Sequence, residues 1–435
     1  MKAITTRLLL LLFMAVVAQP ALAVLKIEIT EGVEGAMPIA VVPFEWSGSP
    51  RLADADVSAI VTSDLLRSGK FAPLPEKDML AKPQTPADID FRTWRIAGID
   101  NLVIGSVHMT AADQFEVRFR LFDIYSGKQV LGYSFKANSS TLRAIAHQIA
   151  DHIYEHLTGI PGAFNTRIAY ITSQQEKGAA PEYRLQVADT DGYNPQTLLT
   201  SREPIMSPSW SQDGARIAYV SFENGKSAIF VQDILTGQRE SIASFSGING
   251  SPAWSPDGKT IAMTLSKDGN PDIYLMSLAD RKLRRLTSHW AIDTEAAWMP
   301  DSRSIVFTSS RSGKPQLYQL SLEAGAKPQR LTFEGNYNAN ASVSPDGKSI
   351  AFVHGADNSY KIALLFTETR LMQLLTDGPL DESPEFAPNG GMILYASQDK
   401  GTAVLAAVSV DGRNRQRLAL SDGEVREPSW APKRN

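Results

Sequence analysis

The stretch Ser251-Pro-Ala-Trp-Ser-Pro-Asp-Gly258 decides the fold, because the chain repeats it at a nearly constant spacing. Related stretches with the same order of residue types begin at Ser207, Glu295, Ala341, Ser383 and Glu427. Their aromatic or apolar positions are Trp210, Trp254, Trp298, Val343, Phe386 and Trp430, so the steps are 44, 44, 45, 43 and 44 residues. A period of about 40–45 residues predicts an array or a propeller and not a conventional active-site fold.

Each repeat has the pattern of four short strands. In the copy at Trp254, the Ser-Pro-Asp-Gly turn is followed by apolar runs at 260–265, 273–278 and 283–287, with polar turns between them. Proline sets φ at the second turn position, and glycine accepts the backbone conformation that other residues avoid. We expect the tryptophans to fill the core between neighbouring sheets and not to stack on a ligand.

The two ends of the repeat region should meet. The segment Arg167-Ile-Ala-Tyr-Ile171 matches Arg216-Ile-Ala-Tyr-Val220, but no copy of the aromatic stretch precedes it. The sixth copy, at Trp430, lacks the strands that follow the others. We therefore expect residues 163–435 to form a six-bladed β-propeller, closed by strands from both ends of the domain, with no free sheet edge.

Residues 24–162 show a different pattern. An apolar run at 39–44 predicts a buried strand, and helical spacing appears at 54–66, at 87–97 and from Ser139 to Leu157, where Gly159 ends the helix. Strands are expected at 102–109, 115–125 and 130–135. The sequence therefore predicts an N-terminal α/β domain, a mixed sheet with covering helices, before the propeller.

Residues 1–23 have the pattern of a cleaved signal peptide. Lys2 and Arg7 precede the apolar run 8–17, and Ala21-Leu22-Ala23 supplies an A-x-A cleavage site. The run is short for a bilayer span, so we expect export with Val24 as the mature first residue and no direct membrane insertion. The chain has no cysteine, which excludes disulfides and thiolate metal sites.

The charge balance argues against polyanionic partners. Without Lys2 and Arg7, 41 Lys and Arg face 47 Asp and Glu, a net charge of −6. Such a surface gives no reason to expect nucleic acid or an anionic membrane as a partner.

Two catalytic alternatives were weighed. His152-Ile-Tyr-Glu-His156 matches the H-x-x-E-H pattern of zinc peptidases, although it also fits the polar flank of the long helix. Propellers of this type also precede serine hydrolase domains, but the sequence holds no G-x-S-x-G nucleophile motif. An exported propeller-containing hydrolase or a zinc peptidase is the alternative to a binding protein.

The binding hypothesis places the site at one mouth of the ring. The loops just before the aromatic positions share a radial location in every blade, and they carry Asp293, Glu295, Asp381, Glu382 and Glu427. This face is either a solvated loop surface or a docking surface for a folded partner. No cofactor is expected, apart from a weakly held cation such as calcium among the carboxylates.

The order of these features resembles the TolB family of the Tol-Pal system. The resemblance rests on the alternating strand from Val24, the segment Pro38-Ile-Ala-Val-Val-Pro-Phe44, the α/β domain and the six Ser-Pro-Asp-Gly-type repeats, and it covers essentially the whole mature chain. It implies a non-enzymatic, monomeric adaptor of the periplasm that supports outer-membrane integrity and envelope constriction during cell division.

The resemblance also implies two binding sites. The propeller mouth would bind the lipoprotein Pal, and colicins would use the same mouth. The residues expected there are Met206, Ser207, Asn249, Ser251, Thr294, Glu295, Asn340, Glu382 and Glu427. Ile248 departs from the histidine-containing loop of the family.

The second site would be the mature N-terminus, which the family implies binds the C-terminal domain of TolA. Residues 24–35 include the alternating strand Val24, Leu25, Lys26, Ile27, Glu28 and Ile29. A free strand of this kind can add to the edge of another sheet. If the strand is instead held within its own domain, it becomes a switch that one partner could release for another.

Overall fold

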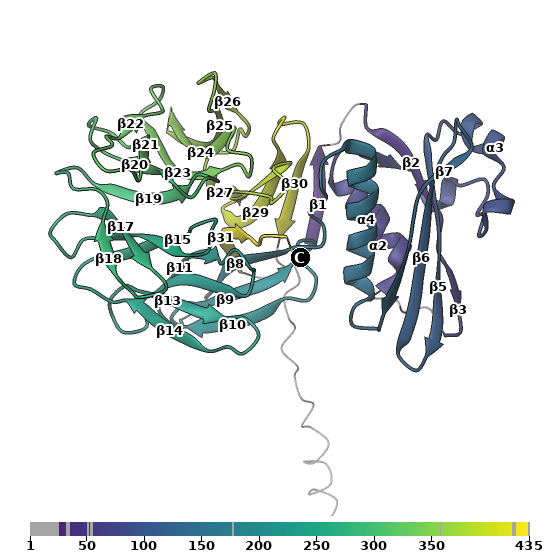
Figure 1. The fold of residues 1–435 in the computed structure, drawn as a ribbon, viewed down its shortest axis with the longest axis horizontal. Coiled ribbons are helices and arrows are strands. Elements are labelled where there is room, and N and C mark those ends of the chain that lie inside the picture. Colours follow the sequence, from purple (N-terminus) through teal and green to yellow (C-terminus); the bar gives the residue numbers. More distant parts are fainter. Residues whose placement is uncertain are drawn as a thin grey trace, which may run out of the picture.

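The computed structural model describes residues 26–31, 35–49, 52, 55–175, 178–356, 358–419 and 423–433. An α/β domain and a β-propeller lie side by side, and strand β1 (Lys26–Glu31) lies between them (Figure 1). The predicted signal peptide, Val24 and Leu25 lie outside the described residues.

The α/β domain contains one mixed sheet, as the sequence predicts. Its strand order is β4-β2-β5-β6-β7, and β3 also pairs with β5. Strand β2 pairs in parallel with β4 and β5, and β3 pairs in parallel with β5. Strand β6 pairs antiparallel with β5 and β7. The bounds are β2 Met37–Val41, β3 Glu45–Ser47, β4 Phe71–Pro73, β5 Asn101–Ala111, β6 Gln114–Asp123 and β7 Lys128–Ala137.

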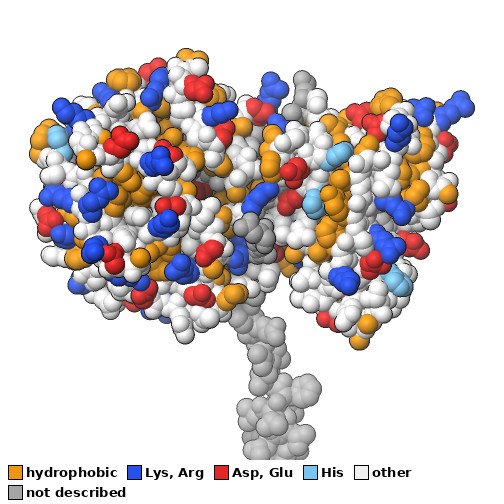
Figure 2. Space-filling model, in the orientation of Figure 1, with side chains coloured by type: hydrophobic (Ala, Val, Ile, Leu, Met, Phe, Trp, Pro, Cys, Tyr) orange, Lys and Arg blue, Asp and Glu red, His pale blue; other side chains and the backbone are white. Residues whose placement is uncertain are grey.

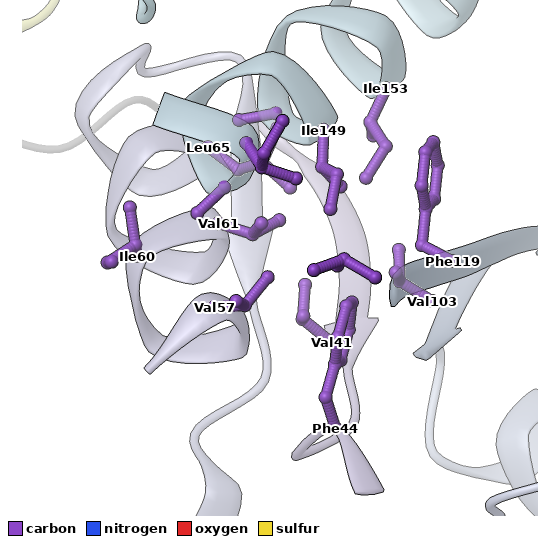
Figure 3. Close-up of a cluster of buried hydrophobic side chains, with 14 of the residues drawn as sticks. Val41, Phe44, Val57, Ile60, Val61, Leu65, Val103, Phe119, Ile149 and Ile153 are labelled. Carbon is purple, nitrogen blue, oxygen red and sulfur yellow. The ribbon is translucent and has the colours of Figure 1, made fainter. Parts of the chain in front are cut away.

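Two helices cover one face of this sheet. Helices α2 (Val57–Arg67) and α4 (Leu142–Thr158) pack on each other and bury Val61, Leu65, Ile149 and Ile153 against Phe119 of β6 (Figure 3). Each fully buried side chain of this size contributes roughly 1.5–3 kcal/mol. Gly159 ends α4 in the left-handed conformation, as its position predicts.

The opposite face of the sheet is covered by shorter segments. They are the 3-10 turns Glu76–Asp78 and Pro86–Asp88 and the helix α3 (Phe91–Ile96). The helix predicted over 87–97 begins only at Phe91, because the Asp90 side chain accepts the Arg92 N–H and caps it there. Trp94 of α3 is buried among the residues of β2 and β5, as its spacing from Phe91 predicts.

The propeller has the six predicted blades, each built from four antiparallel strands of which the first lines the channel. Blade 1 is β11 Ile205–Trp210, β12 Arg216–Ser221, β13 Ala228–Asp233 and β14 Arg239–Ala243; blade 2 is β15 Asn249–Trp254, β16 Thr260–Leu265, β17 Asp272–Ser277 and β18 Leu283–Arg285; blade 3 is β19 Asp293–Trp298, β20 Ser304–Ser309, β21 Gln316–Ser321 and β22 Gln329–Arg330. Blade 4 is β23 Tyr337–Val343, β24 Ser349–Ala356, β25 Ser359–Phe366 and β26 Met372–Leu374; blade 5 is β27 Glu382–Phe386, β28 Met392–Asp399, β29 Thr402–Ser409 and β30 Arg415–Ala419; blade 6 is β31 Glu424–Trp430, β8 Arg167–Gln174, β9 Glu182–Asp189 and β10 Gln196–Ser201.

Both predictions about the propeller core are confirmed. Strand β31 from the chain end pairs with β8, so the two ends of the domain close blade 6. Trp210, Trp254 and Trp298 are buried between blades. The indole N–H of Trp298 donates to the Ala253 carbonyl of the preceding blade at 3.0 Å, and that of Trp210 donates to the Ser429 carbonyl at 3.1 Å. The repeated aromatic therefore joins neighbouring blades.

The N-terminal strand lies elsewhere than expected. The sequence pattern places this strand in the α/β domain, but β1 pairs antiparallel with β30 and forms a fifth strand on the outer edge of blade 5. The register joins Glu28 to Arg417 and Ile29 to Gln416. The outer strand of a blade leaves a row of backbone N–H and C=O groups unpaired, and β1 satisfies them.

Candidate functional site at the channel mouth

A ring of six residues with unusual backbone geometry surrounds the channel. One residue near the middle of each innermost strand has a positive φ between 47° and 55°, and none of the six is glycine. They are Ser207, Ser251, Glu295, Asn340, Ser383 and Glu427. Each lies where the pairing of its strand with the second strand of the blade shifts register, which marks a β-bulge.

The conformation is costly and is held by contacts between blades. A non-glycine residue in the left-handed region costs of order 1 kcal/mol or more. The Glu427 carboxylate accepts a hydrogen bond from the Ser207 N–H of blade 1. The Glu295 carboxylate likewise accepts from the Asn340 N–H of blade 4, at 3.0 Å, and from the Thr308 hydroxyl, at 2.8 Å. These two carboxylates therefore fix the bulges of neighbouring blades.

Most of the residues predicted for the mouth are brought together here. Ser207, Ser251, Glu295, Asn340 and Glu427 occupy five of the six ring positions. Met206, Thr294 and Glu382 each precede a ring position by one residue. The repeat spacing predicts this convergence, because equivalent positions of all blades face the same channel.

The residues two positions before each ring residue are buried. Asn249 is fully buried: its side chain accepts the Phe245 N–H and donates to the Ser227 carbonyl, so its position supports the loop and leaves no surface for a partner. Asp293 and Asp381, expected on an acidic rim, are also buried. Asp293 pairs with Arg311, and Asp381 accepts from the Ser397 hydroxyl.

The channel itself carries carboxylates that repel one another. Burial raises the pKa of Glu427, the Ser207 N–H opposes this, and the charge of Glu382 raises it further. Glu385 lies two residues beyond the ring in blade 5, where burial raises the pKa of its carboxyl to about 7. A cavity of about 550 Å³ continues from the ring toward the Ser-Pro-Asp-Gly turns. None of the described residues that line it is Lys, Arg or His.

Sequence reasoning missed three residues of this region. Trp290 and Ile292 lie in the loop before β19, and their side chains are 77% and 50% exposed. Glu385 faces the channel at a position where the other blades carry Ser or Ala. Aligning the repeats could have found Ile292, because it occupies the position of Ile248 in the next blade.

The H-x-x-E-H motif lies on α4, as the sequence predicts, but its first histidine packs on an aromatic ring. His152 stacks on Tyr133 of β7, with ring centroids 4.5 Å apart. Across the part of the chain that the structure describes, no group of three or more His, Cys, Asp or Glu side chains is placed to hold a metal ion. The zinc-peptidase alternative therefore has no geometric support in the described residues.

The geometry defines the class of protein: a six-bladed β-propeller joined to an α/β domain, with a channel mouth that carries carboxylates. A family model described as the TolB beta propeller domain matches residues 154–434, and one described as the TolB amino-terminal domain matches residues 25–130. The chain belongs to the TolB family.

Relatives of similar length agree. The chain is 57% identical to the Tol-Pal system protein TolB of Xanthomonas oryzae pv. oryzae over 94% of this chain and 93% of that protein. It is 57% identical to the Tol-Pal system protein TolB of Nitrosococcus oceani over 97% of each chain. The crystal structure of TolB from Acinetobacter baumannii matches with a TM-score of 0.87 and 43% identity, covering 94% of this chain and all of that one.

Proposed function

We propose that the protein is a non-enzymatic adaptor of the Tol-Pal system that binds Pal at the propeller mouth and TolA through β1. In this proposal it acts in the periplasm, after cleavage before Val24, in outer-membrane integrity and in envelope constriction during division. The observation that carries the proposal is the ring of six left-handed residues at the mouth. Family membership supplies the system to which the partners belong.

The mouth suits a folded partner. Hydrogen bonds between blades hold the bulges, so the surface is organised before a partner arrives and little ordering entropy is lost on binding. The partly buried Ser251 and Ser383 lie around the ring between the carboxylates of Glu295 and Glu427. Colicins would enter at the same mouth, and a weakly held cation such as calcium would reduce the repulsion among its carboxylates.

Strand β1 suits a partner that adds a strand. It is the terminal strand of a five-stranded sheet, and among the described strands it pairs with β30 alone. In this proposal TolA pairs with the edge of β1 that β30 occupies, so TolA takes up β1 only after β1 leaves β30. Pairing with β30 is thus the closed state of a switch, and TolA binding requires its release.

A binding role also accords with the chemistry of the described residues. The mouth offers hydrogen-bonding groups and carboxylates, which are the groups that a polar protein surface can bind. Among the described residues, no helix is both long and apolar enough to cross a bilayer. Lys and Arg are interspersed with Asp and Glu over the face shown in Figure 2, in keeping with a protein partner and not a nucleic acid.

The two sites can be tested separately by calorimetric titration with the periplasmic domain of Pal and the C-terminal domain of TolA. Thr294→Arg fills the mouth and should abolish Pal binding. Leu235→Arg places the same side chain at the opposite end of the ring, where Leu235 is 91% exposed, and should leave Pal binding unchanged.

The second variant removes residues 24–35. TolA binding should be lost, while Pal binding should stay the same or become tighter. If the wild-type protein binds no Pal, or if the deletion removes both activities together, the proposal of two separable sites is wrong.

A further inference from the structure

Three apolar side chains are exposed in the loops before the innermost strands of two neighbouring blades. Ile248 is 49% exposed in the loop before β15, and Trp290 and Ile292 are exposed in the loop before β19. We call these three residues the apolar arc. Large exposed apolar groups that lie together beside a polar mouth are typical of protein recognition surfaces.

The backbone holds both isoleucines in the same way. The Ile248 N–H donates to the Ser266 hydroxyl at 2.7 Å, and its carbonyl accepts the Ser266 N–H at 3.1 Å. Ile292 makes the same pair of bonds with Ser310, both at 3.0 Å. The repeat therefore presents two isoleucines in equivalent, fixed positions on adjacent blades.

Trp290 is held from the other side of its loop. The Asn270 amide, from the loop between β16 and β17, donates to the His289 carbonyl at 3.0 Å and to the Ala291 carbonyl. Both carbonyls flank Trp290, so its backbone is anchored while 77% of the side chain faces solvent. A tryptophan exposed on an anchored backbone is the type of residue that dominates binding energy at protein interfaces.

The arc lies at the end of the ring away from the α/β domain. The α/β domain contacts the turns at the other end: the Asn389 amide donates to the Pro161 carbonyl, and the Asn414 amide donates to the Arg67 carbonyl. Strand β19 starts beside Trp290 and ends at the turn that corresponds to Asn389. The arc and the mouth therefore form one surface that the α/β domain leaves free.

We propose that the apolar arc anchors the partner, so that the partner docks off-centre over blades 2 and 3. The partner chemistry that fits is an apolar protrusion with a basic group beside it. The protrusion would pack on the arc. The basic group would face the carboxylates of Glu295 and Glu427 in the channel lining, where none of the described residues is cationic, and that of Glu382, whose charge acts on Glu427. This inference rests on the proposed function and specifies how Pal would be recognised.

The test is the affinity of the full chain for the periplasmic domain of Pal, measured by calorimetric titration. Trp290→Ala should weaken binding about 10- to 100-fold, the range expected for a tryptophan hot spot. Leu235→Ala, an exposed apolar residue at the opposite end of the ring, is the matched control and should leave the affinity unchanged. Both side chains are exposed, so thermal unfolding should match the wild type.

The basic component is tested with Glu382→Gln, whose control is the exposed surface substitution Glu368→Gln. Only the first should weaken binding and reduce its dependence on salt. Wild-type binding that Trp290→Ala leaves unchanged overturns the arc but not the proposed function. Absence of wild-type binding overturns the proposed function instead. Light scattering of the protein without Pal gives a further check. A molar mass that differs between Trp290→Ala and the wild type would assign the arc to self-association and also overturn the inference.

Discussion

At the scale of single residues, the mouth combines strained backbone with buried charge. The ring residues adopt φ values that favour glycine, yet four of them are serine or asparagine and two are glutamate. All six residues line the channel at the bulges of the innermost strands. Substituting glycine would relieve the strain but would remove the side-chain contacts between blades that Glu295 and Glu427 provide.

Glu385 gives a pH-dependent prediction at this scale. Burial raises the pKa of its carboxyl to about 7, above the value in the unfolded chain, so folding favours the protonated form and stability decreases as the pH rises toward 7. Glu385→Gln should therefore raise the free energy of unfolding at pH 8 by about 1–2 kcal/mol, since the channel is open to water and screens part of the cost. Urea denaturation at two pH values measures this.

At pH 5 the variant and the wild type should have nearly equal stability, because Glu385 is then protonated in the folded protein. Glu368→Gln, which makes the same change on an exposed turn, should have no effect at either pH. Equal stability of the Glu385→Gln variant and the wild type at pH 8 would show that the carboxyl is ionised without cost.

At the scale of elements, the pairing of β1 with β30 decides how the N-terminus is used. Strand β30 is bonded to β29 on one side and to β1 on the other. Its Gln416 side chain donates to the Arg67 carbonyl at the end of α2. Strand β30 therefore contacts both the N-terminal strand β1 and the α/β domain. We expect release of β1 to alter the contact between β30 and the α/β domain.

A disulfide across this pair tests the switch. The chain has no cysteine, so Glu28→Cys with Arg417→Cys introduces the only two thiols, at directly paired positions. The oxidised protein should lose TolA binding, because β1 cannot leave β30, and a reductant should restore it. Pal binding should persist in both states.

The single variant Arg417→Cys is the control for loss of the ion pair between Arg417 and Asp399. It should behave like the wild type with and without oxidant. Full TolA binding by the cross-linked protein would mean that TolA uses the free edge of β1 or another surface.

At the scale of the whole molecule, a buried ionic cluster joins the two domains. Asp64 of α2 is hydrogen bonded to His147 of α4 at 2.6 Å and paired with Arg67, whose guanidinium also donates to the Thr190 carbonyl of blade 6. Asp191, in the turn after β9, pairs with Arg143 and lies 3.7 Å from His147. Burial opposes the charged form of His147, but Asp64 outweighs it and raises its pKa.

The sign of this effect gives a third prediction. Because the folded pKa of His147 is raised, its contribution to stability is complete below about pH 6.5 and is lost as the pH rises through the folded value. His147→Gln should lower the free energy of unfolding by roughly 2–3 kcal/mol at pH 6 and by less at pH 9. Arg67, Asp64 and Asp191 are the charged groups that face it.

His156→Gln removes an exposed histidine from the same helix and should leave stability unchanged at both pH values. Urea unfolding curves for the two variants make the comparison. A loss at pH 9 that equals the loss at pH 6 would indicate that His147 acts by packing and not by its charge.

The sequence by itself determined the repeat and therefore the ring. The spacing of the Trp positions requires six equivalent units, and the match of Arg167–Ile171 to blade 1 requires closure by both ends. Periodicity also gave the α/β domain, because apolar alternation and helical spacing are local patterns. The ring positions of the mouth were predictable for the same reason, since a repeat fixes radial location.

Tertiary structure decided the strand pairing and the burial of loop residues, which local sequence patterns do not encode. Strand β1 alternates like any strand, and only the unpaired edge of β30 determines that it joins the propeller. Asn249, Asp293 and Asp381 look like surface groups in the sequence, but the loops fold over them, and each is buried with a partner for at least one of its polar atoms. Ile248 and Ile292 remain exposed because Ser266 and Ser310 bind their backbones. Such contacts join residues distant in sequence, so only the closed ring determines them.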